Sequence, residues 1–225
     1  MAGVILQGVG DPVQLEGLSV EAVKGGQYVR VAPKLPAVIL CDPKDGYNVG
    51  NAQRACANWG VGQLWWTGDR VSLGKVDVAD VIDSPKVKAR QTPEDRKAGR
   101  LPREERMKGW ASVELINHAR PFDFYTRLSP KPRIICVELL KGAQHLFHYQ
   151  HPQDAVYVFG PEDGSVPDYA RHLCHERLMA PTAGCMNLAA AVNVVLAFRL
   201  KSLIDQGLVE DKPVDQFLTE HRGVL

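Results

Sequence analysis

Three short polar segments carry the side chains best suited to chemistry. They are NVGNAQR at Asn48–Arg54, FGPEDG at Phe159–Gly164, and CMN at Cys185–Asn187. Arg54 falls early on a largely apolar predicted helix, and a buried or half-buried arginine needs an anionic partner. A phosphate group or Glu162 can supply that charge. Such a set suits reactions that depend on positioning and charge stabilisation rather than on a metal.

Each segment taken alone also has a simpler interpretation. FGPEDG follows an apolar strand, where glycines let the backbone turn and approach a ligand, and ligands bind beyond the carboxyl ends of strands in open α/β sheets. The same residues are equally compatible with a plain strand-to-helix turn that leaves Glu162 in solvent. In NVGNAQR, Asn48 is expected to cap a helix and Gly50 to allow close packing.

The sequence lacks the motifs that several other reaction types require. The chain has no GxSxG, HExxH or GxGxxG motif after a strand, and the glycines of GDRVSLGK are wrongly spaced for a phosphate-binding loop. His145, His148 and His151 lack a cysteine or carboxylate partner at ligand spacing, so we interpret them as surface or loop histidines. No metal site is predicted.

The segments must be positioned by alternating strands and helices. We expect short strands near 4–6 and 28–31, buried strands at 37–41, 63–67, 113–116, 133–138 and 155–159, and helices at 49–59, after Pro121 and at 187–204. This alternation predicts an α/β fold with a mostly parallel sheet and helices on both faces. The helix at 187–204 is apolar on most sides, which predicts that a second subunit covers part of it.

The composition is that of a folded, cytoplasmic protein. Hydrophobic residues make up 45% and charged residues 24% of the 225 residues. No apolar stretch is long enough to span a membrane, and the N-terminus does not resemble a signal peptide. The five cysteines have no CxxC spacing, and we expect reduced thiols.

A basic stretch at about 84–108 holds nine basic and four acidic residues, whereas the whole chain has a net charge of only +1. Such a local excess of positive charge is expected where a protein binds a polyanionic partner. The predicted RNA-binding residues are Lys86, Lys88, Arg90, Arg96, Lys97, Arg100, Arg103 and Arg106. Gly99 and Pro102 limit any helix that begins at Pro93, so a short helix or an irregular insertion is expected.

In this order, the three segments resemble the three motifs of the SpoU/TrmH-type SPOUT RNA methyltransferases, with GNAQRACANWG, FGPE and MNL closest to the TrmL branch. The matching residues are Asn48, Gly50, Arg54, Gly160, Glu162, Gly164, Cys185 and Asn187. The resemblance covers about 37–203. Two departures are Cys185, where the family has serine, and Gly164, which comes one residue early.

The resemblance implies a C-terminal trefoil knot, a homodimer through the knot region and C-terminal helix, and a domain at 37–225 after an extension at 1–36 of unknown role. It also implies S-adenosylmethionine as cofactor. The implied cofactor-binding residues are Glu138, Leu139, Gly160, Met179, Pro181, Met186 and Leu188. The implied catalytic residues are Arg54, Asn48, Glu162 and Asn187.

The function that follows is ribose 2′-O-methylation of RNA, with tRNA favoured over rRNA. Two alternatives stay open: a catalytically weak RNA-binding protein on the same fold, and a base-methylating SPOUT enzyme. Because arginine stays protonated at neutral pH, we expect Arg54 to stabilise charge on the acceptor or hold a phosphate, oriented by Glu162.

Overall fold

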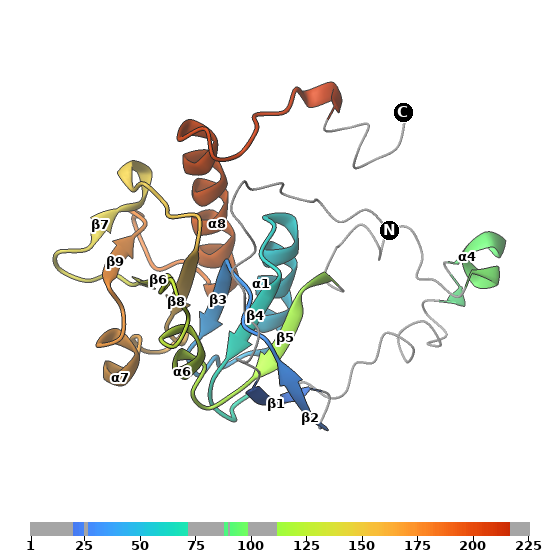
Figure 1. Cartoon of the computed structure of the whole chain (residues 1–225), viewed down its shortest axis with the longest axis horizontal. Helices are drawn as coiled ribbons and strands as arrows, with labels where there is room; N and C mark the ends of the chain where they lie inside the picture. The colour runs from blue at the N-terminus through green and yellow to red at the C-terminus, as the bar shows by residue number, and fades with distance from the viewer. Residues whose placement is uncertain (1–19, 25–26, 72–87, 90, 99–111, 217–225) are drawn as a thin grey trace.

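A single twisted sheet organises the computed structural model, which describes residues 20–24, 27–71, 88–89, 91–98 and 112–216 (Figure 1). Seven strands run parallel: β3 (Ala37–Leu40), β4 (Gln63–Trp66), β5 (Glu114–Asn117), β6 (Arg133–Val137), β7 (Gln144–His145), β8 (Ala155–Phe159) and β9 (Glu176–Met179). Two more strands are β1 (Val20–Lys24), which pairs antiparallel with both β5 and β2, and β2 (Gln27–Val31) at the edge. The order across the sheet is β2-β1-β5-β4-β3-β8-β6-β9-β7.

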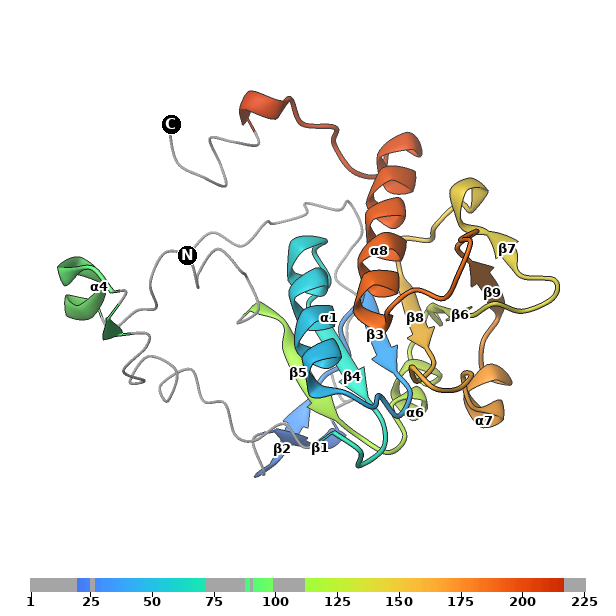
Figure 2. The same cartoon turned by 180° about the vertical axis from the view of Figure 1, so that it is seen from behind.

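Helices cover both faces of this sheet. On one face lie α1 (Gly46–Asn58) and α8 (Leu188–Asp205), which stand in front of the sheet in Figure 2. The opposite face is covered by α6 (Phe122–Tyr125) and α7 (Asp168–Arg171). The described residues also form the short helix α4 (Pro93–Lys97) and the 3₁₀ helix η2 (Leu146–His148).

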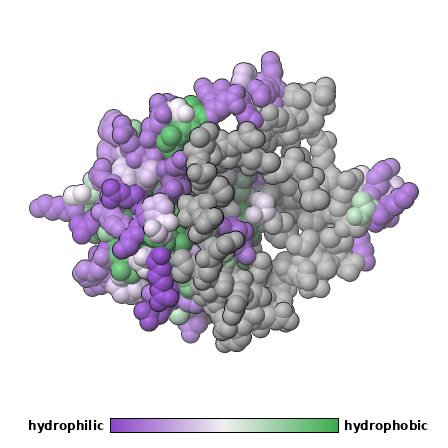
Figure 3. Space-filling model, viewed as in Figure 1, coloured by the Kyte–Doolittle hydropathy of each residue, from purple (hydrophilic) through white to green (hydrophobic). Residues whose placement is uncertain are grey.

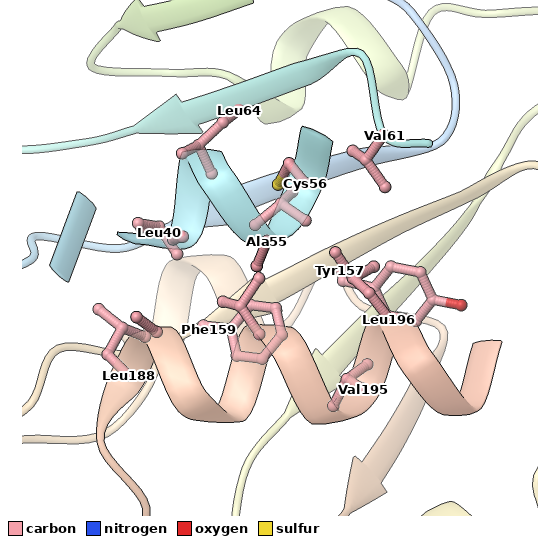
Figure 4. Close-up of a cluster of buried hydrophobic side chains, with 14 of the residues drawn as sticks. Leu40, Ala55, Cys56, Val61, Leu64, Tyr157, Phe159, Leu188, Val195 and Leu196 are labelled. Carbon is pink, nitrogen blue, oxygen red and sulfur yellow. The ribbon is translucent and has the colours of Figure 1, made fainter. Parts of the chain in front are cut away.

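The central strands are buried on both sides, which explains their unbroken apolar runs. In β3 all four residues have no exposed surface. Val38 and Leu40 point into the layer beneath α1 and α8, whereas Ala37 and Ile39 point into the layer beneath α6. Figure 4 shows side chains of α1, α8 and the strands between them gathered in the first layer.

The predicted α/β architecture with a mostly parallel sheet is confirmed, and the strand order is compatible with the expected knot, which stays a prediction. β1 pairs with β5 and β2 pairs with β1, so these strands within 1–36 extend the same sheet. The domain boundary at residue 36 stays a prediction, and the strand expected near 4–6 falls outside the described residues.

Two local expectations were wrong. The N-cap of α1 is Asp45, whose carboxylate accepts from the Tyr47 N–H at 2.8 Å, so Asn48 lies inside the helix. Gly50 is exposed, and a Cβ added there would meet nothing within 4 Å, so close packing does not explain this glycine.

His151 also differs from its expected surface position, because it has no exposed surface at all. Its Nδ1 lies 2.6 Å from the Tyr157 hydroxyl, and its backbone N–H donates to Ser202 on α8. Burial, with a further contribution from the positive charge of Arg199, lowers the pKa of His151 to about 4.

The surface in view in Figure 3 is mostly hydrophilic where it is described, with small apolar patches. None of the described helices combines the length and the apolar character needed to cross a membrane. All five cysteines are free thiols.

Candidate active site

The three polar segments meet at the edge of the sheet where β3 and β8 end and α8 begins. Asn48 donates from Nδ2 to Glu162 Oε1 at 2.6 Å, and Asn187 donates from Nδ2 to Asn48 Oδ1 at 2.8 Å. Residues 114 and 139 positions apart in the chain are thereby joined in one row of hydrogen bonds. The structure brings together three of the four predicted catalytic side chains.

Glu162 is held from two directions. Its second oxygen, Oε2, accepts from the backbone N–H of Lys44 at 2.7 Å, in the loop between β3 and α1. Partial burial alone would raise the pKa of Glu162, but the hydrogen bonds from Asn48 and from backbone N–H groups outweigh it and hold the pKa below its usual value. Glu162 is therefore an acceptor in its ionised form at neutral pH.

The hydrogen bonds of this row set which way each asparagine amide faces. Asn187 is the N-cap of α8, and its Oδ1 accepts from the N–H groups of Ala189 at 2.9 Å and Ala190 at 3.2 Å. Its Nδ2 must then face Asn48, whose Nδ2 must face Glu162. The start of α8 thus sets the orientation of the whole row.

Arg54 stands apart from this row. It is exposed rather than buried or half-buried, and within the described ranges it forms no ion pair. The expected contact with Glu162 is absent there, and the two carboxylate oxygens accept from Asn48 and Lys44 instead. Arg54 instead lines a groove of about 380 Å³ between α1 and α8, together with Asn51, Ala55, Asn58, Asn187, Ala189, Ala190 and Asn193.

A separate cavity of about 170 Å³ lies beneath the row of hydrogen bonds. Six of the seven predicted cofactor-binding residues line it: Glu138, Leu139, Gly160, Met179, Met186 and Leu188. Pro181 is exposed and is not among its lining residues. Glu162 and Cys185 also line this cavity, so two of the polar segments reach it with side chains.

The loop after β8 folds back tightly at Gly160. A Cβ added to Gly160 would lie 2.7 Å from the backbone nitrogen of Val166, so no larger residue fits without moving the main chain. The Glu138 carboxylate, at the end of β6, accepts from that same Val166 N–H at 2.7 Å. The shape of 160–166 is therefore fixed by a glycine on one side and a carboxylate on the other.

A second polar cluster at this edge was not predicted. Arg70, beyond β4, donates to both oxygens of Asp163 at 3.1 and 2.8 Å and approaches Asp42 at 3.4 Å. The pairing with Asp163 raises the pKa of Arg70 and lowers that of Asp163. The rule that polar residues at adjacent strand ends meet at one edge could have found Asp42, Arg70 and Asp163.

Cys185 occupies the position where the family has serine. Its side chain is exposed, and it makes no hydrogen bond to any residue in the described part of the chain. The row from Glu162 to Asn187 closes without it.

The basic stretch is only partly described. Lys88, Arg96 and Lys97 are exposed, with Arg96 donating to the Lys88 carbonyl at 3.0 Å, and α4 confirms the short helix expected after Pro93. Five further predicted RNA-binding residues lie outside the described ranges: Lys86, Arg90, Arg100, Arg103 and Arg106.

The model of the SpoU rRNA Methylase family matches residues 87–197, a range that includes Glu162 and Asn187 but not Asn48 or Arg54. No curated protein sequence gives a significant match.

Solved structures share the fold. A structure reported for the 2-OH methylation of C/U34 on tRNA has a TM-score of 0.52 and 21% identity, covering 75% of this chain and 96% of its own. The SpoU methyltransferase AviRb from Streptomyces viridochromogenes, in complex with AdoMet, has a TM-score of 0.53 and 16% identity, covering 79% and 68%. A TrmH/SpoU tRNA modifying enzyme from A. aeolicus has a TM-score of 0.55 and 14% identity, covering 82% and 85%. The particular likeness to the TrmL branch stays a prediction.

The matched range carries two of the three polar segments, and the sheet around them is the one that SpoU-type enzymes share. Residues 87–197 therefore match the SpoU rRNA Methylase family, and the fold of the chain is the one seen in solved SpoU-type structures.

Proposed function

We propose that this protein transfers a methyl group from S-adenosylmethionine to a ribose 2′-hydroxyl of RNA, and that its substrate is a tRNA. The observation that carries the proposal is the row of hydrogen bonds from Glu162 through Asn48 to Asn187, directly above an apolar cavity. The AdoMet complex of AviRb and the tRNA-modifying structural neighbours support the cofactor and the substrate class.

The cavity suits this cofactor. Met179, Met186 and Leu188 offer apolar walls for an adenine ring and a thioether chain, and backbone groups at Leu139 and Gly160 can hydrogen-bond to ring edges. When bound, S-adenosylmethionine would supply an electrophilic methyl group on a positively charged sulfur. The carboxylates of Glu138 and Glu162 at the cavity wall complement that charge.

Arg54 is the residue we assign to the acceptor. Its guanidinium remains protonated and lies on the groove that also borders Asn187, the last member of the row. In such a transfer the 2′-oxygen would bond to the methyl carbon while the carbon–sulfur bond breaks and an uncharged thioether leaves, and the hydroxyl proton would pass to water. Arg54 would stabilise the negative charge that develops on this oxygen. Glu162 acts as a positioning residue, because it orients Asn48 and the Lys44 loop.

We further propose that the protein is a cytoplasmic homodimer. The free thiols are compatible with the reducing cytoplasm. For the dimer, the support comes from Phe147 on η2, which is 53% exposed and stacks on Phe198 of α8 with ring centroids 4.8 Å apart. Size-exclusion chromatography with multi-angle light scattering would measure the molecular mass of the protein in solution. A monomer at micromolar concentration would contradict the dimer.

The decisive experiment is transfer of tritiated methyl groups from S-adenosylmethionine to fractionated tRNA and rRNA. Nuclease digestion and nucleoside mass spectrometry then identify the product. We expect 2′-O-methylnucleosides in tRNA. Base-methylated products would favour a base-methylating enzyme, and RNA binding without transfer would favour a catalytically weak RNA-binding protein.

Arg54→Ala provides the test of mechanism. Loss of charge stabilisation at a developing oxyanion typically lowers turnover by about 10²- to 10³-fold, and we expect a loss of this order with unchanged affinity for S-adenosylmethionine. Arg127→Ala, an exposed arginine beyond α6, is the matched control. Wild-type turnover in Arg54→Ala would remove Arg54 from the mechanism.

A further inference from the structure

The polar cluster of Arg70, Asp163 and Asp42 has no role in the reaction proposed above. Arg70 follows β4, yet it donates to both oxygens of Asp163, in the loop after β8, at 3.1 and 2.8 Å. It also donates to the backbone carbonyl of Asp42, in the loop after β3, at 3.3 Å. One guanidinium therefore joins the ends of three neighbouring parallel strands, β4, β3 and β8.

The backbone beside Arg70 has an unusual shape that admits this contact. Asp42 has a φ of 45°, in the left-handed region that aspartate tolerates better than most residues, and its N–H donates to the Thr67 hydroxyl at 3.0 Å. Gly68 has a φ of 81°, and a Cβ there would collide with the Asp42 carboxylate. Such conformations persist only where the surrounding structure fixes them. The loops after β3 and β4 therefore pack closely at the place where Arg70 reaches towards β8.

Asp163 belongs to the loop that forms one wall of the cofactor cavity. Gly160, Glu162 and Gly164 line this cavity, whereas Asp163 and Arg70 are not among its lining residues. The two adjacent carboxylates are anchored to different elements, Glu162 to α1 and the loop before it, and Asp163 to Arg70. A contact outside the cavity thus holds the residue that lies between two of its lining residues.

We propose that Arg70 is a positioning residue for the cofactor, because its paired hydrogen bonds to Asp163 hold the loop after β8 in the shape that binds S-adenosylmethionine. A guanidinium that donates two parallel bonds to a carboxylate fixes orientation as well as distance. The proposal rests on the proposed function for the identity of the cofactor. Arg70 is less suited to bind a phosphate of the RNA, since two carboxylates already lie against its guanidinium.

The test measures the affinity for S-adenosylmethionine by isothermal titration calorimetry, in the full chain and well below its melting temperature. The side chains of Arg70 and Asp163 are 31% and 46% exposed, so solvent weakens the pair, and we expect affinity to fall about three- to fivefold in Arg70→Ala and in Asp163→Ala. Arg70→Lys keeps the charge but not the paired geometry and should recover part of the loss. The double variant should bind no more weakly than either single variant, because both changes remove the same contact.

Steady-state kinetics and a control variant separate positioning from general stability. Arg70→Ala should raise the KM for S-adenosylmethionine by the same factor and leave the KM for tRNA unchanged. Arg120→Ala removes another exposed ion pair, with Asp123 at 2.9 Å beside α6, and neither of these residues lines the cavity. This control should leave cofactor affinity unchanged, even where it lowers the melting temperature.

The outcomes distinguish this proposal from the proposed function. Wild-type cofactor affinity in Arg70→Ala overturns the positioning role and leaves the proposed function standing, and a change in the KM for tRNA alone assigns Arg70 to the RNA instead. If the wild type binds S-adenosylmethionine but methylates no RNA, the proposed function fails and the calorimetric series still decides the role of Arg70. If the wild type does not bind it, hydrogen exchange decides: faster exchange in 160–166 of Arg70→Ala keeps Arg70 as the residue that holds this loop, and unchanged exchange removes it.

Discussion

Asn48 is the central side chain of the row, since its amide both donates to Glu162 and accepts from Asn187. Removing it leaves a carboxylate and an amide without their partners, and unsatisfied groups of this kind cost more than the lost bond itself. Activity and stability are therefore coupled through one side chain.

This coupling can be measured with a double-mutant cycle of Asn48→Ala and Glu162→Ala. Because the two side chains share one charge-assisted hydrogen bond, the free energies of unfolding should deviate from additivity by about 0.5–3 kcal/mol. Urea denaturation at neutral pH measures the four proteins, with Asn58→Ala as a partner for Glu162→Ala that should be additive. Additivity between Asn48 and Glu162 would mean that their contact contributes nothing to stability.

Gly160→Ala should disturb the cavity more than its size suggests. The added methyl group would meet main-chain atoms of 165–166, so the loop has to move, and we expect destabilisation of about 1–3 kcal/mol and weaker binding of S-adenosylmethionine. In Gly164→Ala the new Cβ would lie 3.3 Å from the Pro161 ring, a side chain that can shift. Calorimetric titration should therefore show a clear difference between the two variants, and equal affinities would contradict the role given to Gly160.

At the residue scale, the sequence identified which side chains meet but not how they pair. Residue type and order were enough to place Asn48, Glu162 and Asn187 at one site. The pairing of Glu162 with Asn48 rather than Arg54 depends on where α1 begins. Asp45 caps the helix three residues earlier than expected, which turns Asn48 toward Glu162 and leaves Arg54 in the groove.

Among the elements, α1 has a buried face and an exposed face. Gly50 is exposed, and neither packing nor a turn requires a glycine there. Gly50→Ala should raise the free energy of unfolding by about 0.5–1 kcal/mol, because alanine loses less backbone entropy in a helix and its methyl group finds open space. Urea denaturation checks this. A loss of stability would show that the surroundings of Gly50 are tighter than described.

The loop after β8 depends on a neighbouring strand. Glu138→Ala removes the acceptor of the Val166 N–H, so the amide of Val166 should exchange with solvent faster and the cofactor should bind more weakly. Hydrogen exchange followed by mass spectrometry detects the first effect. Protection of Val166 at the wild-type level would indicate that Gly160 alone shapes the loop.

Elements with strong apolar patterns were predictable, and short polar ones were not. β3, β6 and β8 are buried on both faces, so their sequences carry a clear signal. β7 has two exposed residues, and β9 reads ERLM with only Leu178 buried. β9 pairs with β6, and β7 pairs with β9 in turn, so both strands depend on a neighbour that no local sequence pattern reveals.

For the whole molecule, acidification should reduce stability in two separate pH windows. His151 has a folded-state pKa of about 4, below its usual 6.5, so the unfolded chain takes up a proton that the folded one refuses. Stability therefore falls as the pH drops from about 6.5 towards 4, by up to about 3 kcal/mol. The pKa of Glu162 is also lower in the folded protein than in the unfolded chain. Ionised Glu162 therefore stabilises the fold at pH values above its pKa in the unfolded chain, and this contribution is lost as the pH falls further.

His151→Gln separates these windows. Glutamine cannot be protonated in this range, so the dependence of the free energy of unfolding on pH should flatten between about 6.5 and 4 while the more acidic decline remains. His148→Gln, at an exposed position, should leave the curve unchanged. A curve of wild-type shape in His151→Gln would assign the upper window to another group.

The row from Glu162 through Asn48 to Asn187 has a consequence for how the protein is made. Asn48 is translated more than a hundred residues before Glu162 and Asn187, and Asn187 is fixed only when the first turn of α8 has formed. A nascent chain whose synthesis stops before α8 has emerged from the ribosome therefore contains β3 and α1 but not the completed site. The proposed methyl transfer therefore requires nearly all of the described chain to have been synthesised first.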